Sequence, residues 1–147
     1  MRTQDPSDAI IRIGKASIVA RESIYSDLNI FFTPNPVTGD INPIRDTEAI
    51  KRSVVNLILT NFYERPFQPE IGCNVRGLLF EPADAITISD LQDAATQVLE
   101  NFEPRVSVID ISATDDPDNN SYSMTIRFQV LSTEQLTEVT TILERLR

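Results

Sequence analysis

The 147-residue sequence has no histidine, no tryptophan and only one cysteine. Without histidine, the chain cannot build Ser-His-Asp or Cys-His nucleophile arrangements, nor the histidine-based metal sites of many hydrolases. The single Cys73 cannot form an internal disulfide, and one thiol without histidine is not a zinc ligand set. We therefore expect no metal and no cofactor, and we interpret Cys73 as a small core residue in preference to a reactive thiol.

Long apolar runs are also absent. No stretch approaches the roughly 20 apolar residues that a membrane-spanning helix needs. The first residues, Met1-Arg2-Thr3-Gln4-Asp5-Pro6, lack the apolar segment of a signal peptide. We expect a soluble protein that is made in a cytoplasm and has no membrane partner.

Positive charge is scarce. The chain has 13 basic and 22 acidic residues, which give a formal net charge of -9. Such a surface repels a phosphate backbone and releases few of its counterions. We therefore expect no nucleic-acid partner.

Two helices are predicted in the middle of the chain. Asp46 is a good N-cap for a first helix that should end near residues 61 to 62. A capping box, Ser89-Asp90-Leu91-Gln92, predicts the start of a second helix that runs to Phe102. Apolar residues at helical spacing indicate that each helix buries one face, and in the first helix these are Ile50, Val54, Leu57 and Ile58.

After Pro104 the apolar period changes to two, which is typical of strands. Residues 106–111 and 121–130 therefore predict an antiparallel pair. Between Val108 and Ile109 the apolar phase slips, which fits either a β-bulge or burial on both faces. The acidic link at residues 115–120 consists of residue types that favour turns. It lacks the glycine and the terminal glutamate of an EF-hand calcium loop.

A second capping box, Ser132-Thr133-Glu134-Gln135, predicts a last helix with an apolar stripe. The order of helices and hairpin gives an α+β fold, in which helices cover one face of a small antiparallel sheet. The second helix should cover the apolar face of the hairpin. The predicted core residues are Val98, Leu99, Phe102, Ile126 and Phe128.

Residues 1–45 form a predicted N-terminal arm, extended or irregular, ahead of a domain at residues 46–147. Prolines and a glycine break the segment around Thr33-Pro34-Asn35-Pro36 into turns and extended pieces. The arm contains short apolar clusters such as Ile30-Phe31-Phe32, whose burial against a surface would be favourable. Packing on the arm's own domain and donation of a strand to a partner both remain open.

Several motifs, in order, carry a resemblance to a known family. They are Arg65-Pro66-Phe67-Gln68-Pro69-Glu70-Ile71-Gly72-Cys73, then Leu79-Phe80-Glu81, then Asn101-Phe102-Glu103-Pro104-Arg105-Val106. The chain resembles the lysozyme-like baseplate wedge family of contractile-tailed phages, which has a counterpart in type VI secretion. The resemblance runs from about residue 25 to the predicted last helix.

The resemblance implies a structural, non-catalytic subunit with a sheath-like handshake fold, located in the virion tail baseplate and assembled in the host cytoplasm. It implies a sheath initiator that acts by strand addition. Its partners would be other baseplate wedge subunits, the tail sheath protein, and tail tube or hub proteins. In the family the Glu-Pro-Arg motif contacts the wedge core, which assigns that role to Glu103, Pro104 and Arg105.

The resemblance also makes Glu64, Arg65 and Gly72 candidate loop contacts. Glu103 and Arg105 offer an acceptor and a fork of donors, which suits charge-assisted docking. The alternative is an ion pair within the chain, between these two residues or with Glu64 or Arg65.

This chain departs from the family pattern at two places. Where relatives commonly have glycine after the first helix, it has Tyr63, and a tyrosine at positive φ would be strained. We therefore expect the end of this helix to differ from that of the relatives. Residues 31 to 45 resemble an insertion into the arm.

The lysozyme-like label raises one enzymatic alternative, a peptidoglycan-degrading glycoside hydrolase. Such an enzyme needs two carboxyl groups about 5 to 10 Å apart in a cleft. Glu70 and Glu81 are the pair to consider, because they flank an apolar loop. Their spacing is not diagnostic, and exposed acids usually belong to a solvated face.

Overall fold

The computed structural model describes residues 24 to 145 of the chain. Predictions for residues 1–23 and for Leu146 and Arg147 therefore lie outside the described range. The elements, in chain order, are β1 (Ser26–Asp27), β2 (Ile44–Arg45), α1 (Asp46–Leu59), α2 (Val75–Leu78), α3 (Ala85–Phe102), β3 (Val106–Asp116), β4 (Ser121–Val130) and β5 (Gln135–Glu144).

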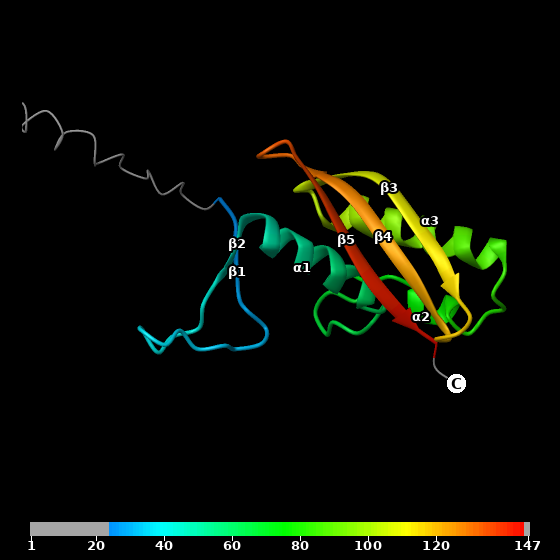
Figure 1. The fold of residues 1–147 in the computed structure, drawn as a ribbon, viewed down its shortest axis with the longest axis horizontal. Helices are drawn as coiled ribbons and strands as arrows, with labels where there is room; N and C mark the ends of the chain where they lie inside the picture. Colours follow the sequence, from blue (N-terminus) through cyan, green and yellow to red (C-terminus); the bar gives the residue numbers. More distant parts are fainter. Residues whose placement is uncertain (1–23, 146–147) are drawn as a thin grey trace, which may run out of the picture.

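The domain has two layers, with helices on one face of a three-stranded antiparallel sheet (Figure 1). The strand order is β3-β4-β5, so β4 is central and both neighbours are edge strands. Helix α3 packs on β3, and α1 packs beside α3 and against β5. This arrangement confirms the predicted α+β fold class.

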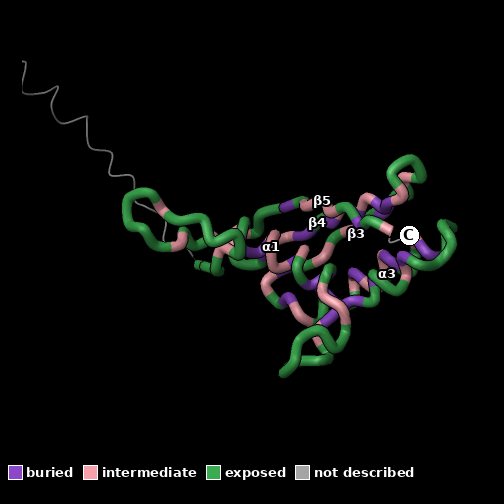
Figure 2. The backbone as a smooth tube through the Cα atoms, turned by 90° about the horizontal axis from the view of Figure 1, so that it is seen from below, coloured by how far each residue is buried: buried purple, intermediate pink, exposed green. Residues whose placement is uncertain are grey.

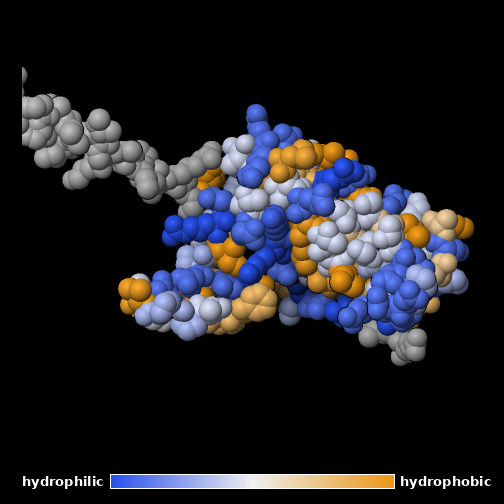
Figure 3. Space-filling model, viewed as in Figure 1, coloured by the Kyte–Doolittle hydropathy of each residue, from blue (hydrophilic) through white to orange (hydrophobic). Residues whose placement is uncertain are grey.

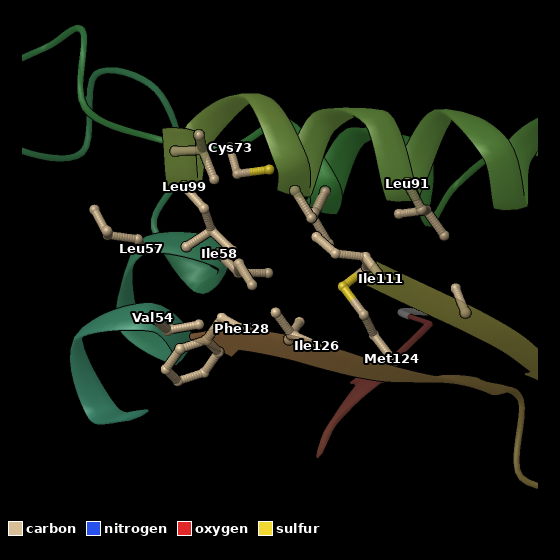
Figure 4. Packing of buried hydrophobic residues seen from close by; sticks show 14 of the residues in the cluster. Val54, Leu57, Ile58, Cys73, Leu91, Leu99, Ile111, Met124, Ile126 and Phe128 are labelled. Atoms are coloured by element: carbon tan, nitrogen blue, oxygen red, sulfur yellow. The ribbon is translucent and has the colours of Figure 1, made fainter. Parts of the chain in front are cut away.

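The core lies between the helices and the inner face of the sheet (Figures 2 and 4). Every second residue of β4 points into it because side chains alternate along a strand. Of the predicted core residues, Val98, Leu99, Ile126 and Phe128 are buried, whereas Phe102 is only partly buried. The buried residues of β4 that form this row are Tyr122, Met124, Ile126, Phe128 and Val130.

The predicted last helix is wrong, because Gln135–Glu144 is strand β5. Apolar residues four positions apart, such as Val139 and Leu143, share a face in a strand as well as in a helix. Residues 137 to 142 are mostly β-branched, which favours a strand. The whole segment from Gln135 to Glu144 pairs with β4 over the full length of that strand. The predicted capping box belongs instead to the turn before β5, where Glu134 has φ 52°.

Both predicted helix starts also need correction. Helix α3 begins at Ala85, before the predicted capping box, because the Asp84 carboxylate accepts a hydrogen bond from the Thr87 amide at 2.8 Å. Asp46 is the first residue of α1 and not its N-cap. Its carboxylate accepts from the amide of Ile24 at 2.8 Å, which ties the arm to the helix.

The hairpin is confirmed and is longer than predicted. Strand β3 extends to Asp116, whereas the sequence pattern indicated an end at Ile111. The register with β4 shifts between Val108 and Asp110, so the predicted slip is a bulge. The bulge leaves Ile109 about half exposed, at 53%.

The described part of the arm, residues 24 to 45, projects from the start of α1 (Figures 1 and 2). Strands β1 and β2 pair with each other, and a bridge between Pro34 and Ile41 closes a hairpin-like excursion. Gly39, at φ 70°, lies in its turn. Apolar atoms gather on this projection (Figure 3), which includes Phe31 and Val37 among its exposed residues.

Candidate functional site

The Glu103-Pro104-Arg105 turn links α3 to β3. Helix α3 ends at Phe102, and the Glu103 amide still donates to the Leu99 carbonyl at 2.9 Å. Pro104 cannot continue the helix because its ring removes the next amide donor. The Arg105 carbonyl accepts from the Leu131 amide at 3.0 Å, which anchors the turn to the end of β4. The backbone of the motif is therefore fixed by the domain.

Glu103 and Arg105 form a bidentate ion pair within the chain. The Arg105 Nε donates to Glu103 Oε1 at 2.5 Å, and its Nη2 donates to Oε2 at 2.7 Å. Ser53 of α1 also donates to Oε2, at 2.5 Å. Glu103 is only 3% exposed, so its charge is compensated almost entirely inside the protein. This is the ion pair within the chain that the sequence left open as the alternative to docking.

The surroundings shift the pKa of both partners. Burial pushes the pKa of Glu103 up, but hydrogen bonds from Arg105 and Ser53 outweigh burial and hold the pKa below its ordinary value. The hydrogen bond to Glu103 raises the pKa of Arg105. Because the Glu103 pKa is lower in the folded state, the pair stabilises the fold at neutral pH and loses that contribution as pH falls through the folded-state pKa.

The arm packs against the outer side of Arg105. Its guanidinium carbon lies 5.4 Å from the centre of the Tyr25 ring, and its Nη1 lies 3.9 Å from the Asp27 carboxylate. The Asp46 amide donates to the Tyr25 carbonyl at 2.8 Å, which holds this part of the arm in place. Arg105 nevertheless stays 25% exposed, and Pro104 is exposed.

A pocket of about 510 Å³ opens beside the turn. The arm, α1, the loop before α2 and the Glu103-Pro104-Arg105 turn supply its walls. Of the candidate loop contacts, Arg65 lines this pocket and lies close to the motif, whereas Glu64 and Gly72 do not line it.

Glu64 and Gly72 hold the loop in shape. The Glu64 carboxylate accepts from the Asn61 amide at 2.8 Å. Gly72 passes so close to the start of the loop that a Cβ there would lie 2.5 Å from the Phe62 nitrogen and from the Asn61 carbonyl carbon. Only glycine fits at this crossing without a shift of the backbone.

Tyr63 has φ 66°, so it adopts the left-handed conformation that glycine favours, although the sequence suggested that a tyrosine would avoid it. Its amide donates to the Pro69 carbonyl at 3.0 Å, so the loop closes in spite of the unfavourable residue. A non-glycine residue in this region stores of the order of 1 kcal/mol or more of backbone strain. The ring is 85% exposed and is free of the core.

The structure does not bring the two acids of the enzymatic alternative into one cleft. Glu70 and Glu81 are both exposed, and Glu70 lines a shallow pocket near Phe62 that Glu81 does not line. Cys73 is buried, and burial raises the pKa of its thiol, which disfavours the reactive thiolate. Within residues 24–145, no three acidic or cysteine side chains gather in a group that could hold a metal ion.

The family follows from a match over most of the domain. Residues 45–135 match the family described as "Baseplate wedge protein gp25". The chain belongs to this family. Baseplate wedge protein gp25 of Enterobacteria phage T4 is 28% identical over 92 residues, which cover 63% of this chain and 70% of the phage protein.

Solved structures show the same fold. A protein named as a tail lysozyme of Geobacter sulfurreducens matches with a TM-score of 0.64 at 20% identity, over 68% of this chain and 91% of that chain. A chain of the anti-feeding prophage baseplate matches with a TM-score of 0.58 at 16% identity, over 84% and 87% of the two chains. At these identities the likeness concerns the fold alone, so the tail lysozyme name carries no activity to this chain.

The family assignment makes the chain a structural wedge protein of a contractile-tail baseplate. It confirms the resemblance that the motifs indicated. Across the described helices, none is long and apolar enough to cross a membrane.

The sequence did not indicate several partners of the motif. Ser53 reaches Glu103 from a helix 50 positions earlier in the chain, and Tyr25 and Asp27 reach Arg105 from the arm. Ser53 stands in no motif, and Tyr25 and Asp27 lie in the segment where the family resemblance begins, with no role assigned to them. Only the folded arrangement brings them to the turn.

Proposed function

We propose that this wedge protein docks on the wedge core through its Glu103-Pro104-Arg105 turn and initiates the sheath by accepting a strand at the outer edge of β5. The observation that carries the proposal is the free edge of β5. In the part of the chain that the structure describes, no strand pairs with β5 on the side away from β4. Its unpaired backbone groups are a ready template for an extended segment.

The other edge of the sheet is less suited to strand addition. Strand β3 carries the bulge at Ile109, which interrupts its regular pattern, and three aspartates at positions 110, 115 and 116. Bulges and charges of this kind blunt an edge strand against pairing. Strand β5 carries two glutamates, at positions 138 and 144, but it has no bulge and pairs with β4 over ten residues without a register shift. These features favour β5 as the accepting edge.

Two apolar grooves flank β5 on its helical side. One, of about 350 Å³, includes Leu79, Phe80 and Leu143. The other, of about 400 Å³, includes Phe31 and Val139. Val139 and Leu143 lie four residues apart on the same face of β5, so an added strand would bury apolar side chains in both grooves.

The arm reaches one of these grooves with Phe31, but no residue from 24 to 45 pairs with β5. The edge therefore stays open in the described part of the molecule. The docking turn lies away from this edge, at the junction of α3 and β3. Wedge binding would then use the turn and sheath binding the edge of β5, two surfaces that meet at Ile30, Arg52 and Asn56.

Two matched variants test the accepting edge. Ile142→Lys places a charge on β5 and Ile109→Lys places the same charge on β3, at side chains that are 66% and 53% exposed. Both variants should fold, because neither side chain is in the core. We expect Ile142→Lys to reduce baseplate-attached sheaths at least about tenfold, equivalent to about 1.4 kcal/mol of lost strand affinity, while Ile109→Lys leaves them unchanged.

The readout is electron microscopy of particles from producing cells, scored for baseplates, bare tubes and sheathed tails. Melting curves of the two purified variants control for folding. Normal sheaths with Ile142→Lys, or lost sheaths with Ile109→Lys alone, would contradict the assignment of the β5 edge.

A further inference from the structure

The pocket beside the docking turn is positively charged in a chain that is strongly acidic overall. Its walls contain Arg52, Arg65 and Arg105 against Asp27 and Glu103, a local balance of three positive and two negative charges, or +1. The whole chain carries -9. A basic pocket on an acidic protein favours an anionic ligand.

Some of the charged side chains that line the pocket already have ion-pair or hydrogen-bond partners within the protein. Both carboxylate oxygens of Glu103 are occupied by Arg105 and Ser53, and Asp27 lies 3.9 Å from Arg105. The salt bridges among residues 24 to 145 include neither Arg52 nor Arg65. These two guanidinium groups are the ones available to a ligand.

Arg52 is already oriented. Its Nη1 donates to Asn29 Oδ1 at 3.0 Å, and its guanidinium lies 5.0 Å from the centre of the Phe31 ring. A guanidinium held over an aromatic ring and by one neutral acceptor keeps its remaining donors for a carboxylate. Arg65 extends from the loop that Gly72 closes, so both cations stand on fixed backbone.

The remaining walls are mostly apolar, with Ser53 and Asn56 as the polar exceptions. Leu57, Ile71 and Phe102 line the pocket together with Leu28 and Ile44. An inorganic anion would leave these side chains without contacts. A carboxylate that is attached to an apolar segment would satisfy the arginines and cover this surface as well.

We propose that this pocket binds an acidic side chain on an apolar segment of another baseplate subunit, with the carboxylate held between Arg52 and Arg65. The proposal rests on the proposed docking role of the neighbouring turn, and it adds the chemistry of the partner. The arm is part of the site, because Asp27, Leu28 and Ile30 form one wall.

The test uses the full-length chain and three capped tripeptides. These are acetyl-Leu-Glu-Ile-amide and its matched forms with glutamine or lysine in place of glutamate, titrated against the ¹⁵N-labelled protein by NMR. The glutamate peptide should shift the amide resonances of residues 61–72 and 102–105. The glutamine peptide should bind about tenfold more weakly, because a charge-assisted hydrogen bond is lost.

The variants define the site. Arg52→Gln and Arg65→Gln should each weaken the glutamate peptide by roughly five- to tenfold. Arg127→Gln is the matched control and should leave binding unchanged, because Arg127 pairs with Asp110 on the sheet, outside the pocket. Arg65→Glu should reverse the preference, so that the lysine peptide binds more tightly than the glutamate peptide. If Arg65 only supported the fold, its replacement by glutamate would not reverse the preference between the two peptides.

Equal affinity for the glutamate and glutamine peptides would overturn the proposal, as would the absence of shifts around the pocket. If inorganic phosphate bound as tightly as the glutamate peptide, the apolar walls would add nothing to the affinity. That result would overturn the proposal that the ligand is an apolar segment. These results are distinct from those for sheath initiation. The peptide experiment uses the isolated chain, whereas the test of the β5 edge scores sheathed tails, so either proposal can fail alone.

Discussion

Phe128→Ala is expected to destabilise the domain by about 3 to 5 kcal/mol, because it empties a large site in a core that cannot close over it. Phe128 is fully buried on the central strand. It lies opposite Val108 of β3 and Thr137 of β5, and beneath α1 near Val54 (Figure 4). Since strands hold it on both sides and a helix covers it, the backbone has little freedom to collapse into the cavity. Urea or thermal unfolding of the purified chain measures the loss.

Phe67→Ala is the matched control for that prediction. Phe67 is 97% exposed, so removal of the same ring should change the stability by no more than about 0.5 kcal/mol. A Phe128→Ala variant as stable as Phe67→Ala would show that the inner face of β4 is assigned wrongly.

Arg105→Ala is expected to destabilise the domain by roughly 3 kcal/mol or more, because it leaves the buried Glu103 carboxylate with Ser53 as its remaining side-chain donor. Arg105 donates both hydrogen bonds of the bidentate pair, and an uncompensated buried charge costs far more than a lost surface contact. Melting of the isolated variant measures this effect. Part of any assembly defect of Arg105→Ala would then be a folding defect.

Two further variants isolate the cause. Arg127→Ala breaks an ion pair with Asp110 that is about half exposed, and it should have a much smaller effect on melting. Adding Glu103→Gln to Arg105→Ala removes the unpaired charge and should recover part of the lost stability. An Arg105→Ala variant that melts like the parent chain would show that Arg105 contributes little to the fold and would leave docking as its main role.

The sequence predicted the elements whose periodicity has one interpretation. In β4 the alternation runs without interruption from Tyr122 to Val130, and the slip at Ile109 marked the bulge. The segment at 135–144 has apolar positions that suit both a helix and a strand, and only pairing with β4 decides between them. Local signals gave the wrong answer there because a tertiary contact outweighs a capping box.

For the candidate site, too, the sequence predicted local features and not the contacts between distant segments. The proline at residue 104 predicted that the second helix stops there, and α3 does end at Phe102. The replacement of the family glycine by Tyr63 drew attention to that position, but the sequence did not predict its φ of 66°. The depth of burial of Glu103, and the contacts of Ser53 and Tyr25 with the pair, depend on how distant segments pack. Such contacts have no signature in a single sequence, since each residue type is ordinary at its own position.

The most direct test of the initiator role is tail assembly in cells that lack this subunit, scored by electron microscopy for baseplates, tubes and baseplate-attached sheaths. A sheath that starts on a preformed strand edge should not start when that edge is missing. Cells without the subunit should lose attached sheaths while baseplates or bare tubes persist, and the full-length gene should restore sheathed tails. Sheathed tails at the normal frequency without the subunit would contradict its role as sheath initiator.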